Sequence, residues 1–410
     1  MELKKIVIVS SGQPSANPRL TKEAIALDAS GYNVTVIYSP ISPWADKYDS
    51  LLFRQYKNIT WVKAGYHSRN DAFRYLISRV RKKAHGILNR IFIRPDLSVK
   101  AITLFSQELI QETCRRKADL YIGHNIGALP AVVNAAHFHH AKSLFDFEDY
   151  HRGEDVLHSA HVRCVTRIEN EYVPKVMVCS TSSPLITKQY SELFAAKSFF
   201  TVLNCFSIGY QKKHHERKED DNLKLFWFSQ YVGKNRGLET ILKGIAYSKS
   251  TKIRLTLLGN CNDGMKDYFN QFASSLGLGK EQLMFIGPVE ESLIVEIASD
   301  HHIGICAEIP KVVNRDICLA NKIFMYLLAG NALFLSNTRA HAAFLAKYHD
   351  TGMVYNHDDA AQIGDLLNGY MNDGGLLEVH RRNSYDLGKK ELNWEVEGER
   401  WLQQIRSLLA

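Results

Sequence analysis

Two cationic residues in the second half of the chain stand where proteins commonly hold phosphate groups. Arg236 lies in KNRG (234–237), after the apolar run LFWFSQ and before a helical pattern, and Lys322 opens the helical pattern NKIFMYLLAG (321–330). The first amides of a helix attract anions, and a guanidinium or ammonium group beside them strengthens the attraction. Together the two residues predict that this half binds a phosphorylated ligand.

Glycines follow several of the apolar runs. Gly259 and Gly287 each follow one, where the lack of a side chain lets a ligand approach the backbone closely. The loop after the first run, SSGQPSANP, contains only Gly12. This loop is not the GxGxxG fingerprint of dinucleotide binding, and the chain has no GxxxxGK[ST] phosphate loop. A redox enzyme and an ordinary kinase are therefore disfavoured.

The first half offers residues that could act on a hydroxyl group. His124 ends an apolar run, and Glu148 and Asp149 follow the next run. An imidazole or a carboxylate within reach of an acceptor hydroxyl can orient or deprotonate it. The alternative interpretations are a hydrogen-bonded histidine at a strand end and an acidic loop that caps a helix. Clustered histidines at 137–140, 214–215 and 301–302 lack complementary ligands, so we expect no metal site.

The elements that must position these residues alternate between strand and helix. Residues 4–38 read as strand, loop, helix and strand, and Gly31 closes the helix. Similar apolar runs recur in ADLYIGH (118–124), KSLFDFE (142–148) and KVMVCSTS (175–182). This alternation predicts an α/β fold with a parallel sheet and ligands at the carboxyl ends of its strands.

The α/β alternation stops at a polar segment and then begins again. Residues 207–222, SIGYQKKHHERKEDDN, are nearly free of aliphatic side chains, and strand and helix patterns resume from 223. We predict an N-terminal domain over 1–205, a linker over 206–222, a second domain over 223–390 and a final helical segment over 391–410. Two Rossmann-like domains joined in this way imply a central cleft.

One segment of the first domain departs from this alternation. Residues 70–95 carry a helical stripe of apolar residues, and eight basic residues between 69 and 94 face a single acid, Asp71. The stripe can pack on the domain and leave a solvated basic face, or the segment can bind anionic lipid headgroups. Nucleic acid is a weaker alternative because no aromatic residues are interleaved in a basic groove.

The composition is that of an ordinary folded protein. The chain has 410 residues, 45% hydrophobic and 23% charged, which fits two or three domains and excludes a mainly disordered or collagen-like chain. The formal net charge of +8 suggests anionic partners. The seven cysteines are spaced singly, and we interpret them as reduced. Neither a membrane-spanning run nor a signal-peptide core occurs, so we expect a cytoplasmic protein.

Taken in order, these segments resemble GT-B glycosyltransferases of the GT4-like group. The resemblance is carried by SSGQPSANPRLTKEAIALDASGYNVTVI, DLYIGHNIGALPAVVNAA (119–136), SLFDFEDYHRGE (143–154), FSQYVGKNRGLETILKGI (228–245), NKIFMYLLAGNALFLSN (321–337) and LNWEVEGERW (392–401). Each motif is weak by itself, but the ordered set spans nearly the whole chain. The resemblance implies that the domains face a central cleft and that the final helix packs back on the first domain.

The resemblance also implies an activity. Such an enzyme moves a sugar from a nucleotide-diphosphate donor, held by the second domain, to a saccharide or lipid-linked saccharide acceptor on the first. The implied enzyme is a retaining, metal-independent hexosyltransferase of cell-surface glycan synthesis that needs no cofactor. The basic amphipathic stretch 69–94, and not the resemblance, motivates the hypothesis of a peripheral position on the inner membrane face. Arg236 and Lys322 would stabilise the leaving diphosphate, and His124, Glu148 and Asp149 would serve the acceptor. The donor-binding residues would be Gly12, Arg19, Gly259, Gly287, Glu308, Asn321 and Met325.

The chain departs from the GT4-like pattern at two places. A second basic residue of the donor loop is replaced by Tyr231, so Lys234 or Arg19 would have to complete the phosphate clamp. The glutamate that contacts the ribose aligns with Met325, whose thioether cannot accept two hydroxyl hydrogen bonds. Either Glu308 or Asn321 compensates, or the protein is a catalytically inactive partner subunit. A sugar-nucleotide epimerase of the same architecture is a further alternative.

Overall fold

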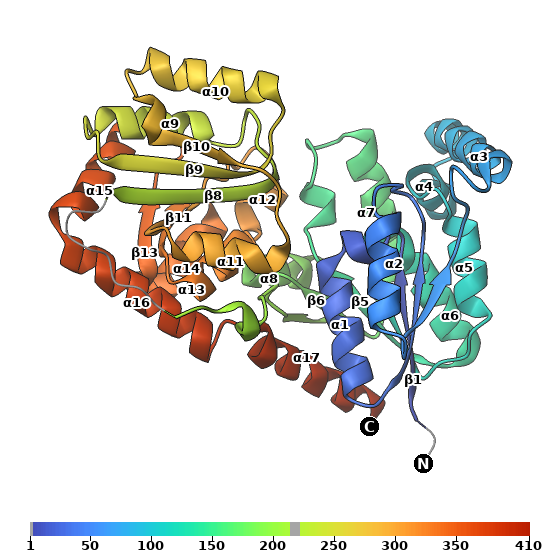
Figure 1. Cartoon of the computed structure of the whole chain (residues 1–410). Coiled ribbons are helices and arrows are strands. Elements are labelled where there is room, and N and C mark those ends of the chain that lie inside the picture. The colour runs from blue at the N-terminus through green and yellow to red at the C-terminus, as the bar shows by residue number, and fades with distance from the viewer. Residues whose placement is uncertain (1–2, 214–221) are drawn as a thin grey trace. The chain divides into compact units, whose positions relative to one another are not determined.

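The computed structural model describes residues 3–213 and 222–410, which form two compact α/β units (Figure 1). The first unit extends to Val202 and also includes Val312–Asn314 and Gly398–Ala410. The second comprises Leu203–Lys311 and Arg315–Glu397. Part of the predicted linker, including His214 and His215, lies outside the described residues.

The first unit is built on a seven-stranded parallel sheet with the strand order β3-β2-β1-β4-β5-β6-β7. Its strands are β1 (Lys5–Ser10), β2 (Asn33–Tyr38), β3 (Thr60–Lys63), β4 (Leu120–His124), β5 (Lys142–Phe147), β6 (Val178–Thr181) and β7 (Ser198–Thr201). Its helices are α1 (Pro18–Ala29), α2 (Asp46–Gln55), α3 (Ala72–Ile91), α4 (Pro95–Ile102), α5 (Ser106–Cys114), α6 (Leu129–His139), α7 (Ala160–Tyr172) and α8 (Pro184–Leu193).

The local sequence explains the elements that begin this unit. All residues of β4 and all but the first of β1 and β5 are buried, and because successive side chains of a strand point to opposite faces, both faces of the sheet are covered. Helix α1 begins where the Asn17 side chain accepts a hydrogen bond from the Leu20 amide, and Pro18 fits the first helical position. The predicted order of strand, loop, helix and strand is confirmed.

The second unit is built on a six-stranded parallel sheet with the strand order β10-β9-β8-β11-β12-β13. Its strands are β8 (Leu223–Tyr231), β9 (Ile253–Asn260), β10 (Leu283–Ile286), β11 (Ile303–Cys306), β12 (Ala332–Ser336) and β13 (Gly352–Tyr355). The helices of this half are α9 (Leu238–Tyr247), α10 (Asp263–Ser275), α11 (Glu291–Ser299), α12 (Val313–Ile317), α13 (Lys322–Ala329), α14 (Arg339–Lys347), α15 (Ala360–Asn372), α16 (Gly374–Lys390) and α17 (Trp394–Leu409). The end of α17 belongs to the first unit.

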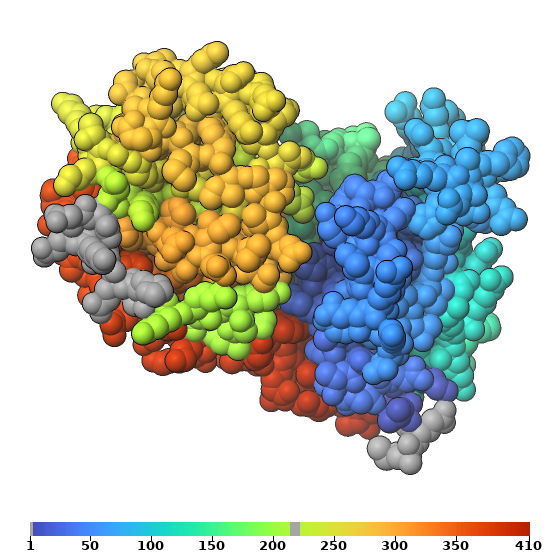
Figure 2. Space-filling view, in the orientation of Figure 1, coloured from blue at the N-terminus to red at the C-terminus, as the bar shows by residue number. Residues whose placement is uncertain are grey.

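Helix α3 forms where the apolar spacing predicts a helix, but its apolar stripe faces solvent rather than the first unit. The apolar stripe does not pack on the first unit: its large side chains are exposed at Phe73, Leu76, Ile77, Val80, Ile87, Leu88 and Ile91. The buried residues of the helix are instead Ser78 and Asn89. The interpretation of 70–95 as a packed stripe with a solvated basic face is therefore wrong. Figure 2 shows this segment projecting at the upper right of the first unit.

No helix within residues 3–213 and 222–410 combines the length and the apolar content that crossing a bilayer requires.

Candidate functional site

Each sheet has one place where the strand order reverses direction, and candidate residues gather at both. In the first sheet the reversal lies between β1 and β4, and in the second it lies between β8 and β11. At such a point the loops after two neighbouring strands run to opposite sides and leave a crevice at the carboxyl ends of the strands. The two places are the default ligand sites of the two units.

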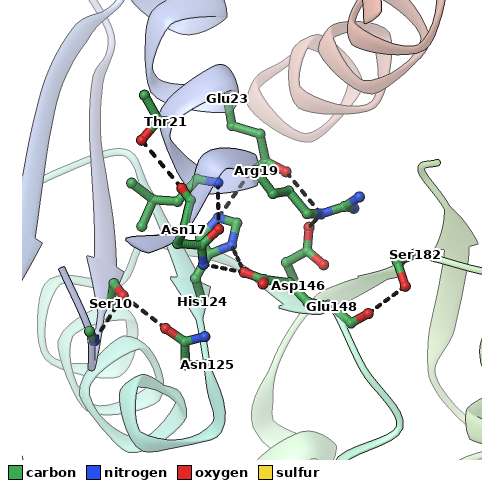
Figure 3. A network of polar contacts seen from close by, with 12 residues as sticks. Ser10, Asn17, Arg19, Thr21, Glu23, His124, Asn125, Asp146, Glu148 and Ser182 are labelled. Carbon is green, nitrogen blue, oxygen red and sulfur yellow. Dashed lines mark hydrogen bonds and ion pairs between the residues drawn. The ribbon is translucent and has the colours of Figure 1, made fainter. Parts of the chain in front are cut away.

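In the first unit, Arg19 is buried in a cluster of carboxylates (Figure 3). Its Nε lies 2.7 Å from Asp146 Oδ2 and 3.7 Å from Glu23 Oε1, and its Nη1 donates to the Val202 carbonyl over 2.6 Å. Although burial opposes the charge of each group, Arg19 lowers the pKa of Asp146 and Asp146 raises the pKa of Arg19. Arg19 therefore acts inside the first unit as the partner of Asp146.

His124 joins this cluster from the end of β4. Its Nε2 lies 3.0 Å from Glu23 Oε2 and its Nδ1 lies 2.9 Å from Glu148 Oε1. Burial alone lowers the pKa of His124, but the Glu23 carboxylate and the hydrogen bonds to both glutamates raise it to about 10. Burial raises the pKa of Glu23 to about 7 against the attraction of His124. The two carboxylates, one at each ring nitrogen, favour the protonated form of His124.

Further polar groups extend the network toward the ends of β1 and β6. The Asn17 amide donates to Glu148 Oε1, and the Ser182 hydroxyl donates to the Glu148 carbonyl. The Ser10 hydroxyl donates to Asn125 Oδ1 over 2.9 Å across β1 and β4, and it accepts from the Gly12 amide over 3.1 Å. Predicted residues Arg19, His124 and Glu148 therefore share one network with Asn17, Glu23 and Asp146. Gly12 belongs to a separate set of contacts with Ser10 and Asn125.

Asp149 lies beside this network rather than in it. It accepts a hydrogen bond of 2.8 Å from Asn314 Nδ2, and both residues belong to the first unit. Burial raises the pKa of Asp149. The structure therefore places Glu148, rather than Asp149, against His124.

Within the described part of the chain, Glu23, His124 and Asp146 also form a group whose ligand atoms lie within 4.8 Å of one another, as a metal site requires. The Arg19 guanidinium already occupies the cationic position between the two carboxylates. A divalent cation there would be repelled by Arg19 at close range. The arrangement favours an internal ion-pair network over a metal centre.

In the second unit, Glu308 binds two cations just beyond β11. Its Oε1 lies 3.0 Å from Lys322 Nζ at the start of α13, and its Oε2 lies 3.0 Å from Arg315 Nη1. Lys322 lowers the pKa of Glu308 to about 2, and Glu308 raises the pKa of Lys322 although burial opposes this. The Lys322 ammonium also lies 5.7 Å from the Trp227 ring. Glu308 therefore favours the charged form of this lysine and holds its ammonium group at the start of α13.

Arg236 lies at the neighbouring strand end. Its Nη1 donates to the Ser229 hydroxyl of β8 over 3.1 Å, and its charge lowers the pKa of Lys322 slightly against the larger effect of Glu308. Gly237 follows with φ +76°, and a Cβ there would lie 2.6 Å from the Ala307 carbonyl oxygen. Only glycine lets the turn before α9 approach the loop after β11 so closely. The two predicted cations are therefore brought to one end of the sheet.

The two other glycines of this unit differ from each other. Gly259 has φ +149°, and a Cβ would lie 2.2 Å from the Ser229 carbonyl oxygen, so it is required by the close approach of β8 and β9. Gly287 follows β10, an edge strand, and has open space around its α-carbon. Gly259 lies in β9, beside β8, whereas Gly287 follows the edge strand. Gly259 is therefore the nearer of the two to the reversal between β8 and β11.

The residues at the two departures from the GT4-like pattern are also placed. Met325 has no exposed surface, and its neighbours along α13 are buried as well. Asn321 is exposed at the start of the same helix. Tyr231 is exposed, while the Lys234 ammonium lies 3.8 Å from the Tyr268 ring centroid. In this structure Met325 has no atom with which to contact a ligand.

Sequence analysis missed several residues that hold the predicted ones in place. Glu23 and Asp146 in the first unit, and Ser229 and Arg315 in the second, contact predicted residues directly. Asp146 carried a visible signal, since it is the only carboxylate of the strand KSLFDF and stands between two phenylalanines. The spacing of Arg19 and Glu23, four residues apart in a helix, was a second signal.

Comparison with known proteins places the fold. No family model matches the sequence, and no curated protein matches it. Solved structures do match. HepE of Anabaena in complex with UDP is 13% identical with a TM-score of 0.68, over 99% of this chain and 100% of its own. Sucrose-phosphate synthase of Thermosynechococcus elongatus is 12% identical with a TM-score of 0.71, over 99% of each chain.

A glycosyltransferase of Rickettsia africae is also similar, with 12% identity and a TM-score of 0.68 over 100% of this chain and 99% of its own. At these identities the likeness concerns the fold. Two parallel-sheet α/β units with this likeness constitute the GT-B architecture, and the predicted fold class is confirmed.

Proposed function

We propose that the protein transfers a sugar from a nucleotide-diphosphate donor, bound by the second unit, to an acceptor bound by the first. The observation that carries this proposal is the pair Arg236 and Lys322 at the strand reversal between β8 and β11. Arg315 and Lys322 share one carboxylate, Glu308, and Arg236 at the neighbouring strand end contacts the Ser229 hydroxyl, so these residues together carry a net positive charge. A diphosphate fits this charge.

The same residues account for the chemistry of the donor. As the bond between the sugar and the diphosphate breaks, negative charge grows on the departing phosphate. Fixed cations stabilise that charge without reorganising at the moment of reaction. Glu308 holds Lys322 in one position, and Ser229 anchors one arm of Arg236 and leaves the rest of its guanidinium available. The proposal therefore requires no metal ion or cofactor.

On the acceptor side, the geometry supports Glu148 as the group that contacts the hydroxyl. His124 has no exposed surface and its two ring nitrogens contact Glu23 and Glu148, so an acceptor hydroxyl cannot reach it. Glu148 keeps 22% of its side chain exposed and is held through Oε1. We infer that His124 positions Glu148 and that the second Glu148 oxygen orients the acceptor.

The finer parts of the proposal rest on the resemblance to the GT4-like group. They are retention of the anomeric configuration and a saccharide or lipid-linked saccharide acceptor in cell-surface glycan synthesis. The exposed apolar face of α3 supports a lipid-linked acceptor at a membrane surface. The configuration of the product, read by NMR during turnover, tests the first of these.

Thermal unfolding in the presence of nucleoside diphosphates and then their sugars tests donor binding. We expect one nucleoside diphosphate to raise the melting temperature, and its sugar to be consumed when an acceptor is added.

Arg236→Ala and Lys322→Gln should each lower turnover at least about tenfold with the melting temperature nearly unchanged. Arg254→Ala, at the amino end of β9 in the same unit, is the matched control and should keep the wild-type rate. Wild-type rates in both site variants would exclude the leaving-group role.

One observation favours a second candidate, an inactive partner subunit. Met325 and Ile317, which align with the two glutamates of the GT4-like pattern, are both buried. If no nucleotide or nucleotide sugar alters the melting temperature, the second candidate replaces the first. Consumption of the donor without any acceptor would instead indicate an epimerase.

A further inference from the structure

Helix α3 presents apolar residues to solvent and polar residues to the rest of the first unit. Phe73, Val80 and Ile91 are 76%, 62% and 67% exposed, whereas Ser78 and Asn89 are buried. A helix on the surface of a globular protein normally has the reverse arrangement. A continuous apolar face of this kind marks an interaction site.

Specific contacts fix α3 in this orientation. Arg81 Nη2 donates to both carboxylate oxygens of Glu108 in α5, each over 2.7 Å. Asn89 Oδ1 accepts from Ser98 Oγ of α4 over 3.0 Å, and Asn89 Nδ2 lies 3.1 Å from Cys164 Sγ of α7. Turning the apolar face inward would break each of these contacts. The exposure is therefore a property of the fold.

A groove of about 1720 Å³ runs beside the apolar face, between α3, α4 and α7. Its lining includes exposed apolar residues of the helix and of the segment after it, such as Leu76, Val80, Ile87 and Ile93. The cationic residues that line it are Arg79, Lys82, Lys83, Arg90, Arg163 and Arg167, and no carboxylate belongs to the lining. The groove thus combines apolar walls with an unbalanced positive charge.

Most of these cations have no counter-ion. In residues 3–213 and 222–410, no ion pair involves Arg79, Lys82, Lys83, Arg90 or Arg167. Lys82 is half-buried, and burial lowers its pKa, so its charged form gains from an added anion. Arg79, Lys83 and Arg90 are four and seven residues apart, which places them in one row along the helix, next to the row of Leu76, Val80 and Ile87.

We propose that α3 and this groove bind the surface of a membrane that contains anionic phospholipids. The apolar face of α3 lies among the acyl chains, and lipid phosphates occupy the groove against its cations. This inference goes beyond glycosyl transfer and does not depend on it. A second copy of the chain could cover the apolar face, but it would bring two rows of like charges together. A bilayer supplies both the apolar surface and the opposite charge.

Sedimentation with vesicles tests the proposal on the full-length protein. Vesicles of phosphatidylcholine with phosphatidylglycerol should pellet the protein, pure phosphatidylcholine should bind it far more weakly, and high salt should reduce binding. The triple variant Arg79→Gln, Lys83→Gln, Arg90→Gln should lose affinity for anionic vesicles by about a hundredfold. Arg81 is left unchanged because it ties α3 to Glu108.

Two matched controls separate the site from general charge and apolarity. Lys243→Gln, Lys249→Gln, Lys252→Gln removes the same charge from exposed positions of the second unit and should keep binding within a few fold. Phe73→Gln, Val80→Gln, Ile91→Gln removes the apolar face and should abolish binding, whereas Met284→Gln, Val379→Gln, at exposed positions elsewhere, should not.

Three outcomes would overturn the inference. They are no pelleting with any vesicle, equal losses in the groove triple and the lysine control, and a concentration-dependent dimer that the apolar variant abolishes while vesicles do not bind. The melting-temperature shift by nucleotide is measured on the same variants and should be unchanged. Vesicle binding without a nucleotide shift would refute the proposed function and leave this inference standing.

Discussion

The two strand reversals hold polar clusters of opposite character. In the first unit, Arg19 and His124 are enclosed by three carboxylates, and both cations are buried. In the second unit, a single carboxylate, Glu308, holds Lys322 and Arg315, and the Arg315 side chain is 46% exposed. In the first cluster the carboxylates outnumber the cations, while in the second the cations outnumber the carboxylate.

This difference indicates a division of labour between the units. A buried network in which nearly every group has an internal partner fixes the position of its one accessible member, Glu148. A cluster with excess positive charge at a strand end is completed by an anionic ligand. Orientation of an acceptor fits the first, and reception of a phosphate fits the second.

The largest effect on stability is expected from a substitution that breaks the first cluster. Asp146→Asn leaves the buried Arg19 guanidinium without its main partner and should reduce the free energy of unfolding by about 3–5 kcal/mol. Glu308→Gln should cost less, about 1–2 kcal/mol, because Arg315 reaches solvent and the Lys322 side chain is 13% exposed, against 2% for Arg19. Denaturant titration measures both. Asp263→Asn, whose side chain is 98% exposed, is the control, and equal losses at Asp146 and Glu308 would remove the distinction.

The pH dependence of stability should have opposite sign in the two units. The folded pKa of His124 is raised from 6.5 to about 10, so its stabilisation is complete below pH 6.5 and is lost as pH rises toward 10. Burial lowers the pKa of His341 to about 4, so stability is lost as pH falls from 6.5 toward 4. Each effect is on the order of 3 kcal/mol.

Calorimetric unfolding across pH separates the two histidines. His124→Gln should flatten the loss of stability on the alkaline side only, and His341→Gln should flatten the loss on the acidic side only. A variant that keeps the wild-type slope on its own side would show that the other buried groups, such as Glu23, dominate that limb.

An effect smaller than those at Asp146 and the two histidines concerns backbone geometry. Gly259→Ala should destabilise the protein by about 2 kcal/mol, because φ is +149° and the added carbon would lie 2.2 Å from the Ser229 carbonyl oxygen. Gly12→Ala should stay within about 0.5 kcal/mol, since its nearest contact would be 3.6 Å away. A large loss of stability in Gly12→Ala would mean that the first unit also requires a residue without a side chain at this position.

The fold was largely predictable because it depends on local alternation. Apolar runs separated by helical patterns predicted β1, α1 and β2, and later β4, β5 and β6, with bounds close to those observed. The strand order was not predictable from these patterns, since it depends on which strands pair. That order decides that β4 lies beside β1 and β5, and so which polar residues meet.

The candidate sites could be predicted only in part for the same reason. His124 and Glu148 were found because they follow strands, whereas the partnership of Arg19 with Asp146 required the pairing of distant segments. Helix α3 shows a further limit. Apolar spacing says which residues share a face of a helix, but only contacts such as that of Arg81 with Glu108 decide which way the face points.

Under the proposed function, the close approach of Gly237 to Ala307 has a consequence for how donor preference can change. With no room for a side chain at Gly237, the turn that carries Arg236 cannot slide past the backbone that leads to Glu308. Moving one loop displaces the other, so the two behave as a single mechanical part. A library that randomises residues 232–237 alone changes only one of the two coupled loops. New specificities should emerge when residues 307–311 are varied together with it.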